Sequence, residues 1–202
     1  MGESGQHVVF TRKEERKFSA HHMLLRAARH ALADAESERP GWLYDVLAAM
    51  TFSALTIEAL CNSIGREVIH AWQRDSEACS PMTKVRILRE QLGIPYDDTT
   101  APWSDARALI RFRNDIAHAK PELIKNAETS SEPRVAPLGY KPLSKIEKGL
   151  AIGQARRAVT TAEAIKDALF DKLPVDETMS IVVDGWHQPT TAHFLPTEGP
   201  PA

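Results

Sequence analysis

The feature that most limits how this chain can fold is one long apolar stripe that begins near Trp42. Apolar residues recur there at spacings of three and four, the period that keeps side chains on one side of an α-helix. A helix of this length with a continuous apolar side needs other elements packed along it, so we expect it to lie at the centre of the fold. The stripe consists of Leu43, Val46, Leu47, Met50, Ala54, Ile57, Cys61, Ile64, Val68 and Trp72.

Four other segments combine a helical period with recognisable ends. One opens with a serine followed by proline, which suit the N-cap and the first helical position. Another opens with a serine that has a glutamate three residues later, the spacing of a capping box. Glycine and proline close these segments. We expect the four helices over about residues 13–38, 81–92, 103–121 and 144–173.

Together these segments predict an all-α protein, a bundle of four to five helices in one domain over residues 1–174. A chain of 202 residues is long enough to bury one such core. Residues 126–142 are rich in Ser, Pro and Glu, which is typical of a surface loop. In the short tail, residues 175–202, the run Met179–Val183 favours a single strand or an extended arm, and we expect disorder beyond about Leu195.

Charge and apolar content narrow the classes of function. Lys and Arg total 25 against 27 Asp and Glu, a formal charge of -2, so no global field draws the chain to nucleic acid or to an anionic membrane. Any RNA contact has to be local. The longest apolar run without a charge, residues 46–57, is shorter than the ~20 residues of a membrane span, and the N-terminus lacks the apolar core of a signal sequence. We therefore expect a cytoplasmic protein with no membrane partner.

Residues that could bind a metal ion are few and poorly spaced. The two cysteines, Cys61 and Cys79, form no metal-ligand pattern, and we expect both to be free thiols. The adjacent His21 and His22 point about 100° apart on a helix, and neither has an acidic or cysteine partner four residues on. We expect neither a metal ion nor another cofactor.

Most residues that could carry chemistry lie between Arg111 and Pro121. Arg113 and His118 are five positions apart, about 140° around a helix, while Asn114 and His118 are four apart and share a face. Taken singly, a helical arginine is most often solvated and a lone histidine is most often structural. The local density of cations, out of line with the near-neutral composition, argues for a functional role instead. These cations are Arg107, Arg111, Arg113, His118 and Lys120.

Arg113, Asn114 and His118, followed by Lys120 and Pro121, resemble the signature of the HEPN superfamily: an arginine, a polar residue, and then a histidine after four to six residues. The resemblance implies a four-helix core and a metal-independent endoribonuclease of toxin or defence type, in which a ribose 2′-hydroxyl attacks its own phosphodiester. It makes Arg113 the clamp for the negatively charged phosphorane, His118 the acid and base, and Asn114 the residue that orients them. Contacts with RNA phosphates would come from Arg107, Arg111 and Lys120.

The resemblance also implies partners. HEPN proteins that cleave RNA commonly dimerise with their motif helices facing, so we expect a homodimer with an RNA substrate and, for a toxin, a neutralising protein partner. Some HEPN toxins carry a tyrosine two residues after the histidine, where a nucleotidyltransferase modifies them, but Lys120 stands there in this chain. Two alternatives stay open: a non-catalytic module that binds RNA, a nucleotide or a protein through the same basic cleft, and a purely structural helical dimer.

Glu58 interrupts the apolar stripe, and Asn62 follows it at a distance of four residues on the same face. A buried carboxylate needs a partner. One interpretation is that Glu58 and Asn62 reach across the bundle to hold Arg113 or Asn114 in place. The other is that Glu58 lies at the edge of the stripe in water.

Overall fold

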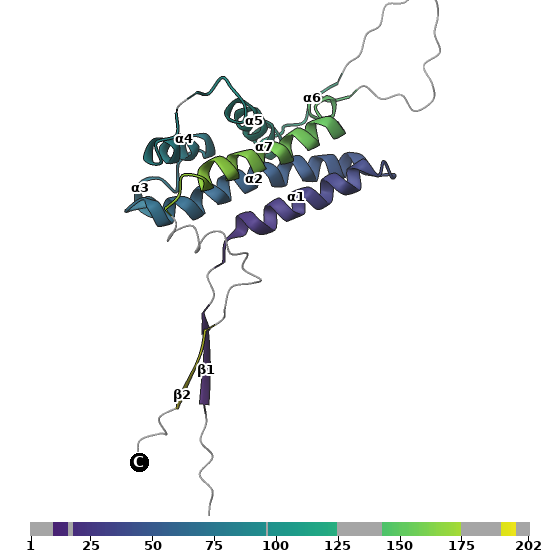
Figure 1. Cartoon of the computed structure of the whole chain (residues 1–202). Coiled ribbons are helices and arrows are strands. Elements are labelled where there is room, and N and C mark those ends of the chain that lie inside the picture. The colour runs from purple at the N-terminus through teal and green to yellow at the C-terminus, as the bar shows by residue number, and fades with distance from the viewer. Residues whose placement is uncertain (1–9, 16–17, 96, 125–142, 175–190, 197–202) are drawn as a thin grey trace, which may run out of the picture.

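The structure, a computed structural model, describes residues 10–15, 18–95, 97–124, 143–174 and 191–196. It is an all-α bundle, as the sequence predicts, to which a ribbon of two strands is added (Figure 1). The helices are α1 (Ala20–Glu36), α2 (Trp42–Val68), α3 (Trp72–Asp75), α4 (Pro81–Gln91), α5 (Trp103–Ala117), α6 (Lys145–Lys148) and α7 (Ile152–Phe170), and the strands are β1 (Phe10–Glu15) and β2 (Thr191–Pro196).

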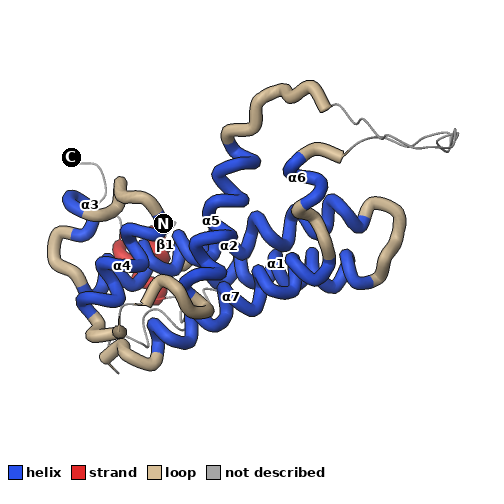
Figure 2. The backbone as a smooth tube through the Cα atoms, turned by 90° about the horizontal axis from the view of Figure 1, so that it is seen from above, coloured by secondary structure: helices blue, strands red, loops and turns tan. Residues whose placement is uncertain are grey.

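The long apolar helix is central, as expected. α1, α4, α5 and α7 all contact α2, and most residues of its stripe between Val46 and Ile64 are buried. Figure 1 shows α1, α2 and α7 running side by side along the bundle. Seen from above in Figure 2, α5 crosses these helices, and its C-terminal end extends past them. α2 is also long and apolar enough to cross a membrane, a test that the core helix of a soluble protein passes as well.

α2 is shorter than its stripe suggests. The last member of the stripe, Trp72, belongs to α3, because the chain reverses at Ala71, whose φ is 64°. The Trp72 ring then folds back onto Gly65, where an added Cβ would lie 2.3 Å from the ring. A glycine and a tryptophan seven residues apart therefore end the helix by packing, which an apolar period does not reveal.

Both ends of the chain differ from expectation. Residues 13–15 are not helical: they belong to β1, which pairs antiparallel with β2, with Phe10 opposite Pro196 and Glu15 opposite Thr191. The reason is a pairing partner far along the chain, which no local pattern shows. The ribbon thus joins a segment from each side of the boundary expected at residue 174, and it extends just beyond Leu195. The strand expected at Met179–Val183 lies outside the described residues.

The caps predicted at two helix starts are present. The Ser80 hydroxyl accepts from the Thr83 N–H (3.3 Å), and Ser144 and Glu147 form the capping box in both directions (3.1 and 2.7 Å). The helix that Ser144 opens is nevertheless only one turn, α6. The backbone becomes extended at Ala151 before α7 begins, so the expected fifth helix is two helices.

Candidate functional site

The motif lies at the end of α5 that leaves the bundle. Trp103, Ala106, Leu109 and Ile110 anchor the first half of the helix in the core. One turn later the helix is no longer packed against the rest of the bundle on all of its apolar side, so the side chains of Arg113 and Asn114 are half-buried and that of His118 is exposed. α5 ends at Ala117, and His118 is its C-cap, exposed, with its backbone N–H donating to the Asn114 carbonyl (3.0 Å).

Arg113 is held by two neighbours. Its Nη2 donates to Oε2 of Glu58 on α2 (2.7 Å), and its Nη1 donates to Oδ1 of Asn114 (2.9 Å). The carboxylate therefore makes the contact that one of the two interpretations expects, and it is half-buried rather than fully solvated at the edge of the stripe. A guanidinium has five N–H donors in a rigid plane, so these two bonds orient it and leave donors for a ligand.

Behind this pair lies a lysine that sequence reasoning missed. Lys84 on α4 is 2% exposed, and its Nζ lies 3.3 Å from Oε1 of Glu58. Burying an ammonium group is costly unless it is paired, so Glu58 is required by Lys84 as well as by Arg113. The group of three has two positive charges and one negative charge, which leaves a net charge of +1 at the exposed end, on Arg113. The sequence pattern could have predicted this burial, because Lys84 is four residues before Leu88 and so lies on the apolar side of its helix.

Asn62 does not take the role expected of it. No hydrogen bond in the described part of the chain joins it to Arg113 or Asn114, and its Oδ1 is buried without a partner. Glu58, one turn earlier, already occupies the guanidinium. Cys61 beside it is fully buried, and burial raises the pKa of its thiol to about 12, with Glu58 adding to the shift and Lys84 opposing it. Cys61 is thus a neutral packing residue.

The cations expected to meet RNA phosphates lie along one exposed side of α5. Arg107, Arg111, Asn114 and His118 follow one another at spacings of four, three and four, which keeps them in line on the helix. Arg111 is exposed and makes no ion pair with another described residue. Arg107 pairs with Asp98. Lys120 is exposed just beyond the helix end.

A second ionic cluster, which sequence reasoning also missed, joins α4 to the first turns of α5. Arg89 on α4 is 1% exposed, lies 4.2 Å above the Trp103 ring, and pairs with Asp98 (3.4 Å). The other oxygen of Asp98 meets Arg107, so one carboxylate joins the two arginines. Trp103 is therefore a core residue that packs under a cation.

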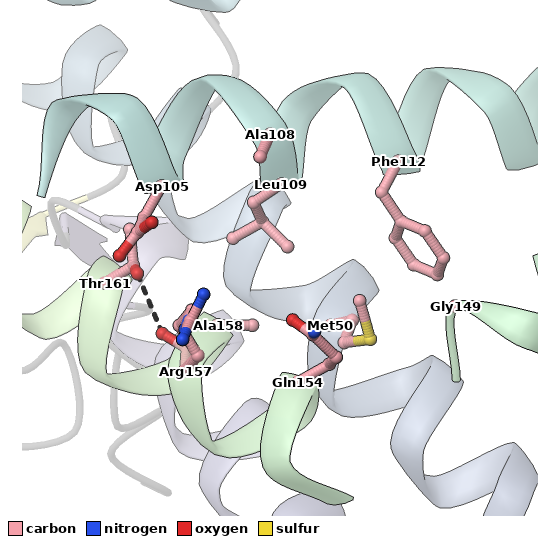
Figure 3. Close-up of a pocket in the computed structure, with 10 residues that line it drawn as sticks. All are labelled: Met50, Asp105, Ala108, Leu109, Phe112, Gly149, Gln154, Arg157, Ala158 and Thr161. Atoms are coloured by element: carbon pink, nitrogen blue, oxygen red, sulfur yellow. Dashed lines mark hydrogen bonds between the residues drawn. The ribbon is translucent and has the colours of Figure 1, made fainter. Parts of the chain in front are cut away.

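A cavity of about 250 Å³ lies on the opposite side of α5, between this helix and α7 (Figure 3). Leu109, Phe112 and Ala158 form apolar walls, and Asp105 and Arg157 lie at its polar end. None of the motif residues Arg113, Asn114 and His118 lines it, so it is separate from the motif.

His21 on α1 is accounted for by packing. His21 is fully buried, and burial, followed by nearby His22 and Lys166, lowers its pKa to about 3. Its Nδ1 lies 3.2 Å from the Ser63 hydroxyl, which itself donates to the Ala59 carbonyl (2.9 Å). His21 is thus a neutral donor to Ser63. Within the described ranges no three His, Cys, Asp or Glu side chains are grouped as metal ligands.

Comparison of the chain with protein-family models, curated proteins and solved structures gives no match. The resemblance to HEPN proteins therefore rests on residues 113–121 and on the helical architecture.

Proposed function

We propose that this protein is a cytoplasmic, metal-independent endoribonuclease of the HEPN toxin or defence type. The observation that carries the proposal is the arginine at the exposed end of the Lys84, Glu58 and Arg113 group. Its guanidinium is oriented by Glu58 and Asn114 yet keeps a net positive charge. An oriented, charged plane with donors to spare suits a phosphorane, which carries more negative charge than the phosphodiester from which it forms.

His118 supplies the proton chemistry in this proposal. Histidine accepts and donates protons near neutral pH, and a positioned proton transfer is worth ~10²–10⁴-fold in rate. Attack by the 2′-hydroxyl needs a base for that hydroxyl and an acid for the leaving 5′-oxygen. One protomer offers one histidine, so we propose a two-fold homodimer in which the C-terminal ends of two α5 helices face each other across the RNA and contribute two His118 residues.

A non-catalytic RNA-binding module is the second candidate. Two of the Arg113 nitrogens are already engaged, and His118 lies past the last turn of α5, where no hydrogen bond to another described side chain fixes its ring. Such a site can attract RNA phosphates without aligning a proton transfer.

The test is cleavage of single-stranded RNA in excess EDTA. We expect products that end in a 2′,3′-cyclic phosphate and a 5′-hydroxyl, and no cleavage of DNA of the same sequence, because it lacks the attacking hydroxyl. His118→Ala should abolish cleavage, and Arg113→Lys should impair it severely because a lysine keeps the charge but loses the planar fork. His30→Ala, at an exposed position of α1, is the matched control and should cleave normally. RNA that binds equally to the wild type and to His118→Ala, but is never cut, would leave the binding module as the function.

A further inference from the structure

We infer that single-stranded RNA runs along the exposed side of α5, from His118 to a second phosphate subsite between α4 and α5 formed by Thr83, Arg86 and Arg107. The inference deepens the proposed function, and it rests on that proposal only for the position of the cut. A cavity of about 220 Å³ opens at this place. It is lined by Met82, Thr83, Val85, Arg86, Asp98 and Arg107.

The charges around this cavity leave an excess that an anion can use. Asp98 is the one carboxylate in the lining, and it is shared by Arg107 and the buried Arg89. Arg86 is exposed, and no ion pair joins it to any other described residue. The lining therefore holds two arginines and one carboxylate, and that carboxylate is also paired with Arg89 behind it. The buried pair of Arg89 with Asp98 fixes the carboxylate, which in turn holds Arg107 at the mouth of the cavity.

The position of the cavity fits a nucleic-acid strand that also reaches His118. Arg107 and His118 are eleven residues apart, about 16 Å along the axis of α5 at 1.5 Å per residue. Arg111 lies between them on the same exposed side. Phosphates of a stacked strand are ~3.4 Å apart along its axis, so the distance corresponds to about five stacked nucleotides, or fewer if the strand is stretched. A phosphate three to five nucleotides from the cut would thus meet Arg86 and Arg107.

RNA fits this row better than an acidic peptide does. A guanidinium binds the two non-bridging oxygens of a phosphodiester as a pair, and the threonine hydroxyl in the lining can donate to the same group. Phosphates recur at a regular spacing along a strand, as the cations do along α5. The chain as a whole carries a net charge of -2, so the affinity for a polyanion has to come from a local row of cations such as this one.

The experiment measures binding of a labelled 12-nucleotide RNA whose scissile nucleotide is 2′-deoxy, so that it cannot be cut. Arg86→Gln and Arg107→Gln should each weaken binding roughly fivefold, and each should reduce the slope of log affinity against log salt by about 0.7, the value for one phosphate of a single strand. Arg157→Gln, an exposed arginine on α7 away from the row, is the control and should change neither quantity. Arg86 makes no ion pair within the described residues, so Arg86→Gln is expected to keep the fold.

A phosphate-by-phosphate scan then locates the contact. Each phosphate of the RNA is replaced in turn by an uncharged methylphosphonate. Three to five nucleotides from the cut, the replacement should weaken binding to the wild type but add no further loss in Arg107→Gln. Additive losses at every position, unchanged binding by Arg86→Gln and Arg107→Gln, or binding of an acidic peptide in place of RNA would each overturn the subsite.

The outcomes separate the subsite from the ribonuclease. Cleavage that depends on His118, together with RNA binding that does not depend on Arg86 or Arg107, refutes the subsite and keeps the enzyme. RNA held through Arg86 and Arg107 but never cut refutes the enzyme and keeps the subsite.

Discussion

Replacing Glu58 by glutamine removes the one negative charge that two cations share, and the structure sets the size of the effect. The more buried cation is Lys84, 2% exposed and 3.3 Å from the carboxylate, whereas Arg113 is 28% exposed and can be hydrated. Removing one partner of a buried ion pair costs ~3–5 kcal/mol. Glu58 is itself 25% exposed, so water reaches the pair, and we expect Glu58→Gln to lower the free energy of unfolding by about 2–3 kcal/mol.

A second substitution tests whether Lys84 is the cause. Lys84→Met removes the buried cation but keeps an unbranched side chain, and it leaves Glu58 paired with Arg113, so we expect a cost below about 1 kcal/mol. In the Lys84→Met background, Glu58→Gln should also cost less than about 1 kcal/mol, because only the hydratable Arg113 loses its partner. The coupling energy between the two sites is then about 1–3 kcal/mol.

The assay is urea unfolding at pH 7, followed by helical circular dichroism, for the wild type, both single variants and the double variant. Glu90→Gln, at an exposed position of α4, is the control and should lie within about 0.5 kcal/mol of the wild type. Equal losses from Glu58→Gln in the presence and absence of Lys84 would refute the reasoning, since Lys84 would then gain nothing from the carboxylate.

Three further predictions concern packing, acid stability and assembly. Gly65→Ala should lower the melting temperature, because its Cβ would lie 2.3 Å from the Trp72 ring. Gly153→Ala on α7 meets nothing within 4 Å and should raise the melting temperature, since alanine stabilises a helix by ~0.5–1 kcal/mol relative to glycine. Thermal melts that show equal shifts for the two variants would contradict this prediction. Folding lowers the pKa of His21 from 6.5 to about 3, so between these pH values the unfolded chain binds a proton that the folded protein does not. The contribution of the neutral, buried ring to the free energy of unfolding is therefore fully present above pH 6.5 and is lost as the pH falls towards 3. Urea unfolding should show that the free energy of unfolding of the wild type falls by roughly 1–2 kcal/mol between pH 7 and pH 5, and that of His21→Leu falls by less. Light scattering should give the mass of a homodimer; a monomer at micromolar concentration would contradict the two-protomer site.

The sequence by itself determined the features that depend on residues a few positions apart. The period of α2 predicts its burial because side chains three and four residues apart share a side of a helix. The caps at Ser80 and Ser144 are predictable for the same reason, since each serine bonds to a backbone N–H three residues away. The row of Arg107, Arg111, Asn114 and His118 on α5 also follows from spacing alone. All of these features depend on spacings of three or four residues, about one helical turn.

Only the tertiary structure decided which distant residues meet. Glu58 lies 55 positions from Arg113 and 26 from Lys84, and β1 pairs with a strand at the other end of the chain. The apolar period places Glu58 in the stripe but leaves open whether it has a buried partner and which one, because the angle at which helices cross selects the partner. The end of α2 depends in the same way on the Trp72 ring against Gly65. Local spacing thus places the motif on its helix, while the charge that Arg113 retains is set by a lysine and a glutamate that only packing brings beside it.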